Sequence, residues 1–173
     1  MSRASLLSLL ALGAALAPSA VMAATPAPGQ PLDQFLGRTV PLCMKAPAVQ
    51  CIDAGFAFAD SDGDGALSPA EVKAAQAQID QWAKQHARQL PKGERERLVM
   101  GLVIVQAVGS DRLFVSYDVD GDGFLSREEV TADIKLDRRP LPEILSDPAA
   151  VDWNGLAARA GQAAPLLKRL FEL

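Results

Sequence analysis

Two twelve-residue segments of the sequence concentrate acidic side chains and glycines in the same order. They are DSDGDGALSPAE, residues 60–71, and DVDGDGFLSREE, residues 118–129. A loop this short brings its alternating carboxylates close together, and their repulsion is costly unless a cation lies between them. Carboxylate and carbonyl oxygens suit Ca²⁺ or Mg²⁺, whereas neither segment offers the imidazole or thiolate that zinc prefers. Each segment therefore predicts a site for a hard divalent cation.

The order of residues in both segments resembles the EF-hand calcium loop, in which acidic positions one, three and five precede a glycine and a final Glu. The resemblance implies two bound Ca²⁺ ions, each held by side-chain oxygens and one backbone carbonyl. The bidentate Glu at position twelve favours Ca²⁺ over Mg²⁺. The implied ligands are Asp60, Asp62, Asp64, the carbonyl of Ala66, Ser68 directly or through water, and Glu71 in the first loop, and Asp118, Asp120, Asp122, the carbonyl of Phe124, Ser126 and Glu129 in the second.

The flanks of the two segments repeat as well, which favours a duplicated unit over two solvated surface turns. Gly65 and Gly123 supply a residue without a Cβ where each loop must turn sharply. A phenylalanine precedes each loop by four residues, and a leucine occupies the eighth position of each loop. Calcium repeats of the β-helix kind have a much shorter period and no flanking helices, whereas these loops start 58 residues apart.

Apolar spacing around the loops predicts an all-α protein. Ser68 is a good N-cap and Pro69 a good first residue for the helix that leaves the first loop. An apolar stripe then recurs at helical spacing as far as Leu90. The lone His86 lies at the edge of this stripe and is expected to pack there rather than to bind metal. Further helices are predicted over 53–59, over 94–108, and from a cap at Ser110 to residue 117.

The helix over 94–108 is an insertion relative to the calmodulin-like pattern, in which paired loops are closer in sequence. It leaves open whether the loops form one lobe or two separate hands completed by other helices. Pairing is favoured, because Leu67 and Leu125 occupy the position at which paired loops of this family touch through a short β-bridge. The prediction is an EF-hand pair with an inserted helix and C-terminal helices.

The N-terminus predicts export. Arg3 precedes an apolar run over 6–17, which is shorter than the roughly 20 residues of a membrane-spanning helix, and small residues follow near Ala23. We expect a signal peptide over 1–23, an extended leader over 24–42, an EF-hand domain over 43–135 and a C-terminal helical extension over 136–173 that packs on it. The signal peptide predicts a periplasmic or secreted location. The alternative is that the segment stays uncleaved as a membrane anchor. The two cysteines, Cys43 and Cys51, are expected to form a disulfide in an oxidising compartment.

The tail contains two amphipathic stretches, over 153–160 and 164–173, which either complete the core or lie in the groove between the EF-hand helices as a target peptide would. Each loop also carries S-x-x-E, the capping-box pattern. Glu71 and Glu129 are therefore expected to choose between the helix cap and the cation, which would form part of a switch.

The amino-acid composition argues against several classes of function. Only Met44 and Met100 remain outside the signal peptide, which argues against promiscuous target binding. A sensor or adaptor with one protein partner is favoured over a calcium-stabilised domain or buffer without switching. A single histidine and the lack of a nucleophile motif argue against an enzyme, with an unrecognised hydrolase as the remaining catalytic alternative. The pI of about 5.0 and the lack of a basic patch argue against nucleic acid, and no stable membrane insertion is expected after signal cleavage.

Overall fold

The computed structural model describes residues 31–172, so the signal peptide expected over 1–23 lies outside the described residues. The fold is all-α, as predicted, and the described chain contains no β-strand beyond two isolated bridges. The α-helices are α1 (Leu32–Cys43), α2 (Ala48–Ala59), α3 (Pro69–His86), α4 (Lys92–Val108), α5 (Ser110–Tyr117), α6 (Arg127–Val130), α7 (Leu141–Leu145), α8 (Trp153–Ala160) and α9 (Ala164–Glu172), and the short 3₁₀ turns are η1 (Ala87–Gln89) and η2 (Gly161–Ala163).

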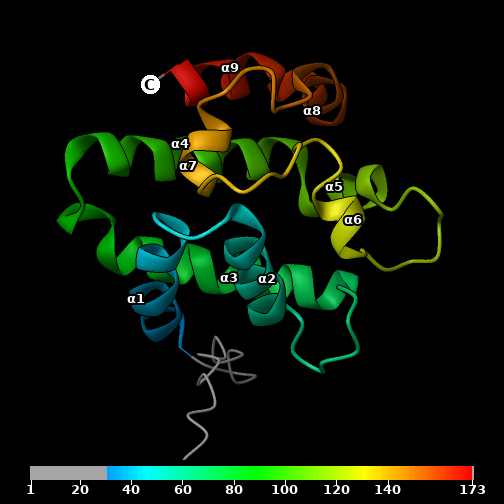
Figure 1. The fold of residues 1–173 in the computed structure, drawn as a ribbon, viewed down its shortest axis with the longest axis horizontal. Helices are drawn as coiled ribbons and strands as arrows, with labels where there is room; N and C mark the ends of the chain where they lie inside the picture. The colour runs from blue at the N-terminus through cyan, green and yellow to red at the C-terminus, as the bar shows by residue number, and fades with distance from the viewer. Residues whose placement is uncertain (1–30, 173) are drawn as a thin grey trace, which may run out of the picture.

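The two long helices α3 and α4 form the middle of the molecule (Figure 1). They are joined by a turn at one end, and both acidic loops lie at the other end, on the right of the view. Helices α8 and α9 form a layer against α4, while α1 and α2 lie beside α3. The inserted helix α4 therefore lies between the tail layer and α3 (Figure 1).

Helix α1 corrects the prediction of an extended leader over 24–42, because residues 32–42 are helical and only the part before them lies outside the description. Leu32, Phe35 and Thr39 recur at helical spacing and are buried. The ring of Phe35 stacks on Phe58 of α2, with centroids 4.3 Å apart. The prolines of this segment misled the prediction, since Pro31 only precedes the helix and Pro41 falls in its last turns.

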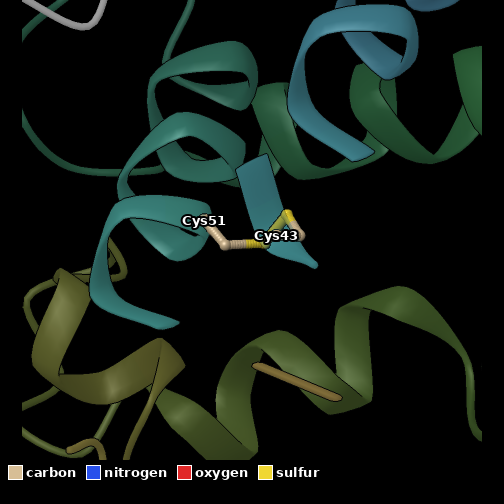
Figure 2. The surroundings of a disulfide bond; sticks show 2 residues. All are labelled: Cys43 and Cys51. Carbon is tan, nitrogen blue, oxygen red and sulfur yellow. A yellow bond between two sulfur atoms is a disulfide. The ribbon is translucent and has the colours of Figure 1, made fainter. Parts of the chain in front are cut away.

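A disulfide bond joins the end of α1 to the first turn of α2, as the two cysteines predicted (Figure 2). The Cα atoms of Cys43 and Cys51 are 4.8 Å apart, and the two cysteines are eight positions apart in the sequence. A bridge that closes so short a loop stabilises the fold by about 2 to 3 kcal/mol, chiefly by restricting the unfolded chain. The bond fixes α1 to the helix that enters the first acidic loop.

The break between α4 and α5 is made by Gly109, with a φ of 87°, a conformation that favours glycine. Ser110 is the first residue of α5, and no side-chain hydrogen bond caps this helix, so the predicted Ser110 cap is wrong. Within the described chain no single helix has the length and hydropathy to cross a membrane, and α4 with α5 passes only as a pair bent by 80°.

Three apolar clusters are buried in the described chain, and each joins segments that are distant in sequence. Ile144 of α7 is completely buried, which anchors the segment after the second loop to the start of α2. The clusters are Phe56, Leu67, Phe114 and Leu125 beneath the acidic loops; Ala48, Ile144 and Ala150 beside α7; and Ile104, Ala160 and Ala163 between α4 and the tail.

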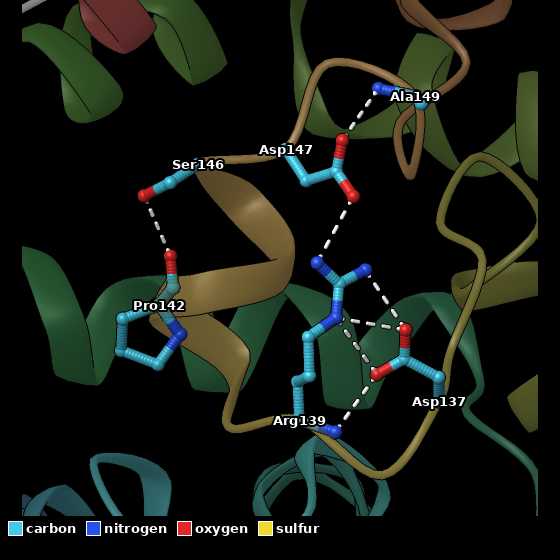
Figure 3. Close-up of polar contacts among 6 residues, drawn as sticks. All are labelled: Asp137, Arg139, Pro142, Ser146, Asp147 and Ala149. Carbon is cyan, nitrogen blue, oxygen red and sulfur yellow. Dashed lines mark hydrogen bonds and ion pairs between the residues drawn. The ribbon is translucent and has the colours of Figure 1, made fainter.

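The segment around α7 is also held by a polar fork (Figure 3). The guanidinium of Arg139 donates to Asp137 at 2.9 and 3.1 Å and to Asp147 at 2.9 Å. The backbone N–H of Ala48 donates to the carbonyl of Arg139 at 2.9 Å. Arg139 thus holds both ends of this segment together and joins it to α2.

Candidate metal centres

Each acidic loop is shaped by hydrogen bonds from its own backbone to its aspartates. In the first loop, Asp60 accepts from the N–H groups of Gly63 at 2.8 Å and Gly65 at 3.0 Å. Gly65 has a φ of 89° and Gly123 a φ of 86°, which confirms the sharp turn predicted at the sixth position of each loop. In the second loop, Asp118 accepts from Gly123 at 3.2 Å. The carboxylates therefore face the inside of each loop.

The first, third and twelfth positions of each loop converge as the sequence predicts. One carboxylate oxygen from each of these residues lies within 4.8 Å of the others; the groups are Asp60, Asp62 and Glu71, and Asp118, Asp120 and Glu129. The fifth-position aspartates Asp64 and Asp122 lie outside these groups and accept from the N–H two residues later, at 2.9 and 2.8 Å. Three anionic groups this close repel one another unless a cation is present.

The final glutamates also cap the helices that leave the loops. Ser68 accepts from the N–H of Glu71, while Glu71 Oε2 accepts from the N–H of Ser68 at 2.9 Å. Ser126 and Glu129 form the same capping box in the second loop. The ninth-position serines, which the sequence also predicts as ligands, are engaged in these caps.

Glu71 and Glu129 do not have to leave the loop in order to cap a helix. In Glu71, Oε2 accepts from Ser68, while Oε1 accepts from the N–H of Ser61 at 2.7 Å and from its hydroxyl at 3.0 Å. In Glu129, Oε1 accepts from the N–H of Val119 at 2.8 Å. Both carboxylates belong to the acidic groups at the same time. In this arrangement each carboxylate serves the helix cap and the acidic group at once, and the switch between cap and cation stays a prediction.

One buried carboxylate oxygen in the second loop indicates whether a cation fits the site. Asp118 Oδ1 is shielded from solvent and accepts no hydrogen bond from any described residue. A buried anionic oxygen without a donor is strongly unfavourable, and a metal ion is the group that would satisfy it among clustered carboxylates. The donor set is entirely oxygen, which suits Ca²⁺. The residues present therefore fit a calcium ion.

The two loops form one unit. Leu67 and Leu125 exchange both of their backbone hydrogen bonds, each 2.9 Å long, which confirms the predicted β-bridge at the eighth positions. Their side chains are buried with Phe56 and Phe114 beneath the loops. The Arg127 guanidinium lies 3.2 Å from Asp53 of α2, which adds an ion pair between the two halves.

An open apolar groove of about 520 Å³ lies beside this unit, between α3, α4 and α5. Leu67, Leu125 and Phe114 belong both to the groove and to the cluster beneath the loops. The remaining lining residues are Ala59, Val72, Ala75, Gln76, Ile79, Arg97, Leu98, Gly101, Leu102, Val105, Ser110, Leu113 and Tyr117. An apolar concavity with this lining is suited to apolar side chains of a partner.

The tail does not fill the groove. Met100, Ile104 and Val108 of α4 pack against the tail, whereas Leu98 and Leu102 face the groove. At 100° per residue these two faces of α4 are about a third of a turn apart. The described tail thus completes a separate core, which was the first of the two predicted alternatives, and none of its described residues lines the groove.

A buried polar network joins the second loop to α8. Asp133 Oδ2 accepts from the hydroxyl of Tyr117 at 2.7 Å and from Arg159 Nε at 3.0 Å. Arg159 also donates to the carbonyl of Ser116 and lies 4.2 Å from the centroid of the Tyr117 ring. Burial and the bond to Asp133 raise the pKa of Tyr117. The sequence does not reveal this network, since Arg159 and Asp133 are 26 residues apart and no local pattern connects them.

Acidification is expected to destabilise the metal-free protein through Glu71. Burial alone would raise the pKa of Glu71, but hydrogen bonds from Ser68 and Ser61 outweigh it and lower the pKa from 4.5 to about 2. A depressed folded-state pKa stabilises the fold above the unfolded value, and this stability is lost as the pH falls from 4.5 towards 2. Urea unfolding without calcium at a series of pH values should show this slope in the unaltered protein.

Glu71→Gln should flatten the same part of the stability curve, because an amide does not titrate there. Glu128→Gln is the matched control, since Glu128 lies in the second loop but is exposed. An identical acid dependence in the unaltered protein and Glu71→Gln would contradict this assignment.

Comparison with known proteins agrees with this geometry. The EF hand family model matches the chain twice, over residues 52–74 and 111–132. Each match contains one complete acidic loop, its capping box and the phenylalanine before it. No curated protein and no solved structure matched the chain. These two segments are therefore EF-hand motifs, and the chain carries two loops of the kind found in EF-hand calcium-binding proteins.

Proposed function

We propose that this protein is an exported calcium-dependent adaptor that binds two Ca²⁺ ions and one protein partner. The observation that carries the proposal is shared packing: Leu67, Leu125 and Phe114 support the paired loops and also line the apolar groove. Any change in the loops on binding calcium therefore acts on side chains that a partner would contact. The groove is open along α3 and α4, which suits an apolar segment of another protein.

The proposed calcium ligands are those of the family pattern. The converging groups would supply three carboxylates to each ion, and Asp64 and Asp122 lie next in each loop. The carbonyls of Ala66 and Phe124 would complete the oxygen set, with Ser68 and Ser126 contributing directly or through water. When bound, each ion supplies positive charge that offsets the repulsion within its loop.

Export is supported by the disulfide and by the sequence before it. A bond between Cys43 and Cys51 persists in oxidising compartments and is rare in the cytosol of mesophiles. The signal peptide expected over 1–23 leads to the same compartments. We therefore place the protein in a periplasm or outside the cell.

The disulfide-intact protein without its signal peptide should be titrated with Ca²⁺ by calorimetry in the presence of Mg²⁺, while an apolar dye reports the groove. Two filled sites with a calcium-dependent increase in dye binding would support the adaptor. Leu102→Glu should remove the dye signal and keep calcium binding, because Leu102 lines the groove. Val103→Glu is its matched control, since Val103 is exposed on another face of α4. Calcium binding by the unaltered protein without any change in dye signal would contradict the adaptor function.

The alternative is a domain that calcium stabilises without switching. It is favoured by the ties between the two hands, namely the Leu67–Leu125 bridge and the ion pairs of Arg127 with Asp53 and Lys73 with Asp111. In that case calcium raises thermal stability in the same titration while the dye signal stays constant.

A further inference from the structure

The two EF hands differ in how the chain is held after the loop. The first loop continues into α3, a helix of 18 residues, so Glu71 is positioned by a long rigid element. The second loop continues into α6, which has only four residues and ends at Val130. One helical turn cannot by itself fix the direction of the chain that follows Glu129. Something else must hold the exit of the second loop.

Arg159 of α8 contacts both ends of this loop. It donates to the carbonyl of Ser116 and lies over the ring of Tyr117, and these two residues directly precede Asp118. It also pairs with Asp133, four residues after Glu129, and Asp133 accepts from the hydroxyl of Tyr117. The entry and the exit of the loop are thus joined through one guanidinium.

The equivalent positions of the first hand have no such groups. A shift of 58 residues relates the loops, so Tyr117 corresponds to Ala59 and Asp133 to Ala75. Neither alanine carries a hydrogen-bonding side chain. The network is therefore specific to the second hand, where it adds to the backbone bridge between Ile134 and Val151 in holding the exit of the loop.

We propose that Arg159 is a positioning residue for the second calcium site, so that helix α8 of the C-terminal extension forms part of that site. Side chains that orient metal ligands from behind change metal affinity by roughly 10- to 100-fold when they are removed. The proposal rests on calcium binding by the second loop.

Asp133 is too buried for water to take over the hydrogen bond and the positive charge that Arg159 supplies. The Asp133 side chain is 5% exposed and that of Arg159 is 20% exposed. Removing one partner of a buried ion pair leaves the other charge without compensation, and the segment then moves to reach solvent. Asp133 would be that charge here, and its movement would carry the exit of the loop away from Tyr117.

Helix α8 approaches Asp133 too closely to allow a larger residue at Gly155. A Cβ at Gly155 would lie 2.5 Å from Asp133 Oδ1 and 2.9 Å from Asp152 Oδ2. Gly155→Ala must therefore displace the Asp133 side chain or α8, although it removes no charged group. It is an independent way to weaken the same contact.

The coupling must also act in the reverse direction, because linkage between two binding events is reciprocal. Calcium in the second loop is expected to slow amide hydrogen exchange in α8 (Trp153–Ala160). Calcium in the first loop alone should leave that exchange rate unchanged. Exchange measured with and without calcium, in Glu71→Gln for the second loop and in Glu129→Gln for the first, reports this without reference to affinity.

The experiment measures calcium affinity one loop at a time. Glu71→Gln silences the first loop and Glu129→Gln the second, and Arg159→Met is introduced into each background. We expect Arg159→Met to weaken the second loop about 10-fold and the first by less than about 2-fold, with partial recovery in Arg159→Lys. Gly155→Ala should give the same difference between loops.

Arg139→Met is the matched control, because Arg139 forms a comparable fork in the C-terminal extension but with Asp137 and Asp147. It should affect both loops equally. Equal effects of Arg159→Met and Gly155→Ala on the two loops, or no effect on either, would overturn the proposal. A failure of the parent backgrounds to bind calcium would instead overturn the proposed function, so the two outcomes are separable.

Discussion

In a Glu71→Gln, Glu129→Gln double variant, calcium is expected to add nothing to the free energy of unfolding. The unaltered protein should gain about 5 kcal/mol when free calcium is 100 times the dissociation constant of each site, since each site contributes about 2.7 kcal/mol. Both glutamates belong to the converging carboxylate groups, and an amide removes the charge and the bidentate ligand. Urea unfolding with and without calcium measures the difference.

Glu128→Gln is the control for this variant. Glu128 precedes Glu129 in the same loop but is exposed and stands outside the converging group. It should retain the full calcium-induced gain. If the double variant kept half or more of the gain, the ligands of at least one ion would have to lie elsewhere in the chain.

Phe114→Ala is expected to lower the free energy of unfolding by about 3 to 5 kcal/mol, because it empties the centre of the cluster beneath the loops. Phe114 is 6% exposed and packs with Phe56, Leu67 and Leu125. Since Leu67 and Leu125 form the bridge between the loops, the loss should also weaken calcium binding at both sites. Denaturation in saturating calcium keeps the variant folded at the start of the measurement.

Val115→Ala provides the comparison, because Val115 is the next residue of α5 and is 72% exposed. Its effect should stay within about 0.5 kcal/mol. If the two variants lost similar amounts of unfolding free energy, the assignment of Phe114 to the buried face of α5 and of Val115 to the exposed face would be wrong. Phe114→Leu, which keeps most of the volume, should cost less than Phe114→Ala.

Local chemistry made the two EF-hand loops predictable. Gly65 and Gly123 marked the turns, Ser68 and Ser126 the helix starts, and the eighth-position leucines the bridge between the loops. Each of these features depends on residues within about one loop length, so it can be predicted from the local sequence. The same leucines favoured the pairing of the loops, even though α4 separates them.

Features made by distant residues were not predictable in the same way. The Arg159–Asp133 pair and the Arg139 fork depend on where helices pack, and no spacing rule gives that position. Helix α1 was missed for a different reason: the burial of Phe35 against Phe58 outweighs the weak helix preference of a segment with prolines. The tail was predicted as amphipathic, but its apolar face could have matched either side of α4.

Because of the bridge between Leu67 and Leu125, the order of the first loop depends on a segment that is distant in the sequence. All side chains of its family pattern are present by residue 71, yet the backbone partner of its eighth position comes 58 residues after Leu67. Closing a chain segment of this length costs about 4 kcal/mol of entropy beyond a constant term. A fragment that ends between α3 and α5 therefore keeps every acidic ligand of the first loop and lacks the contact that orders it.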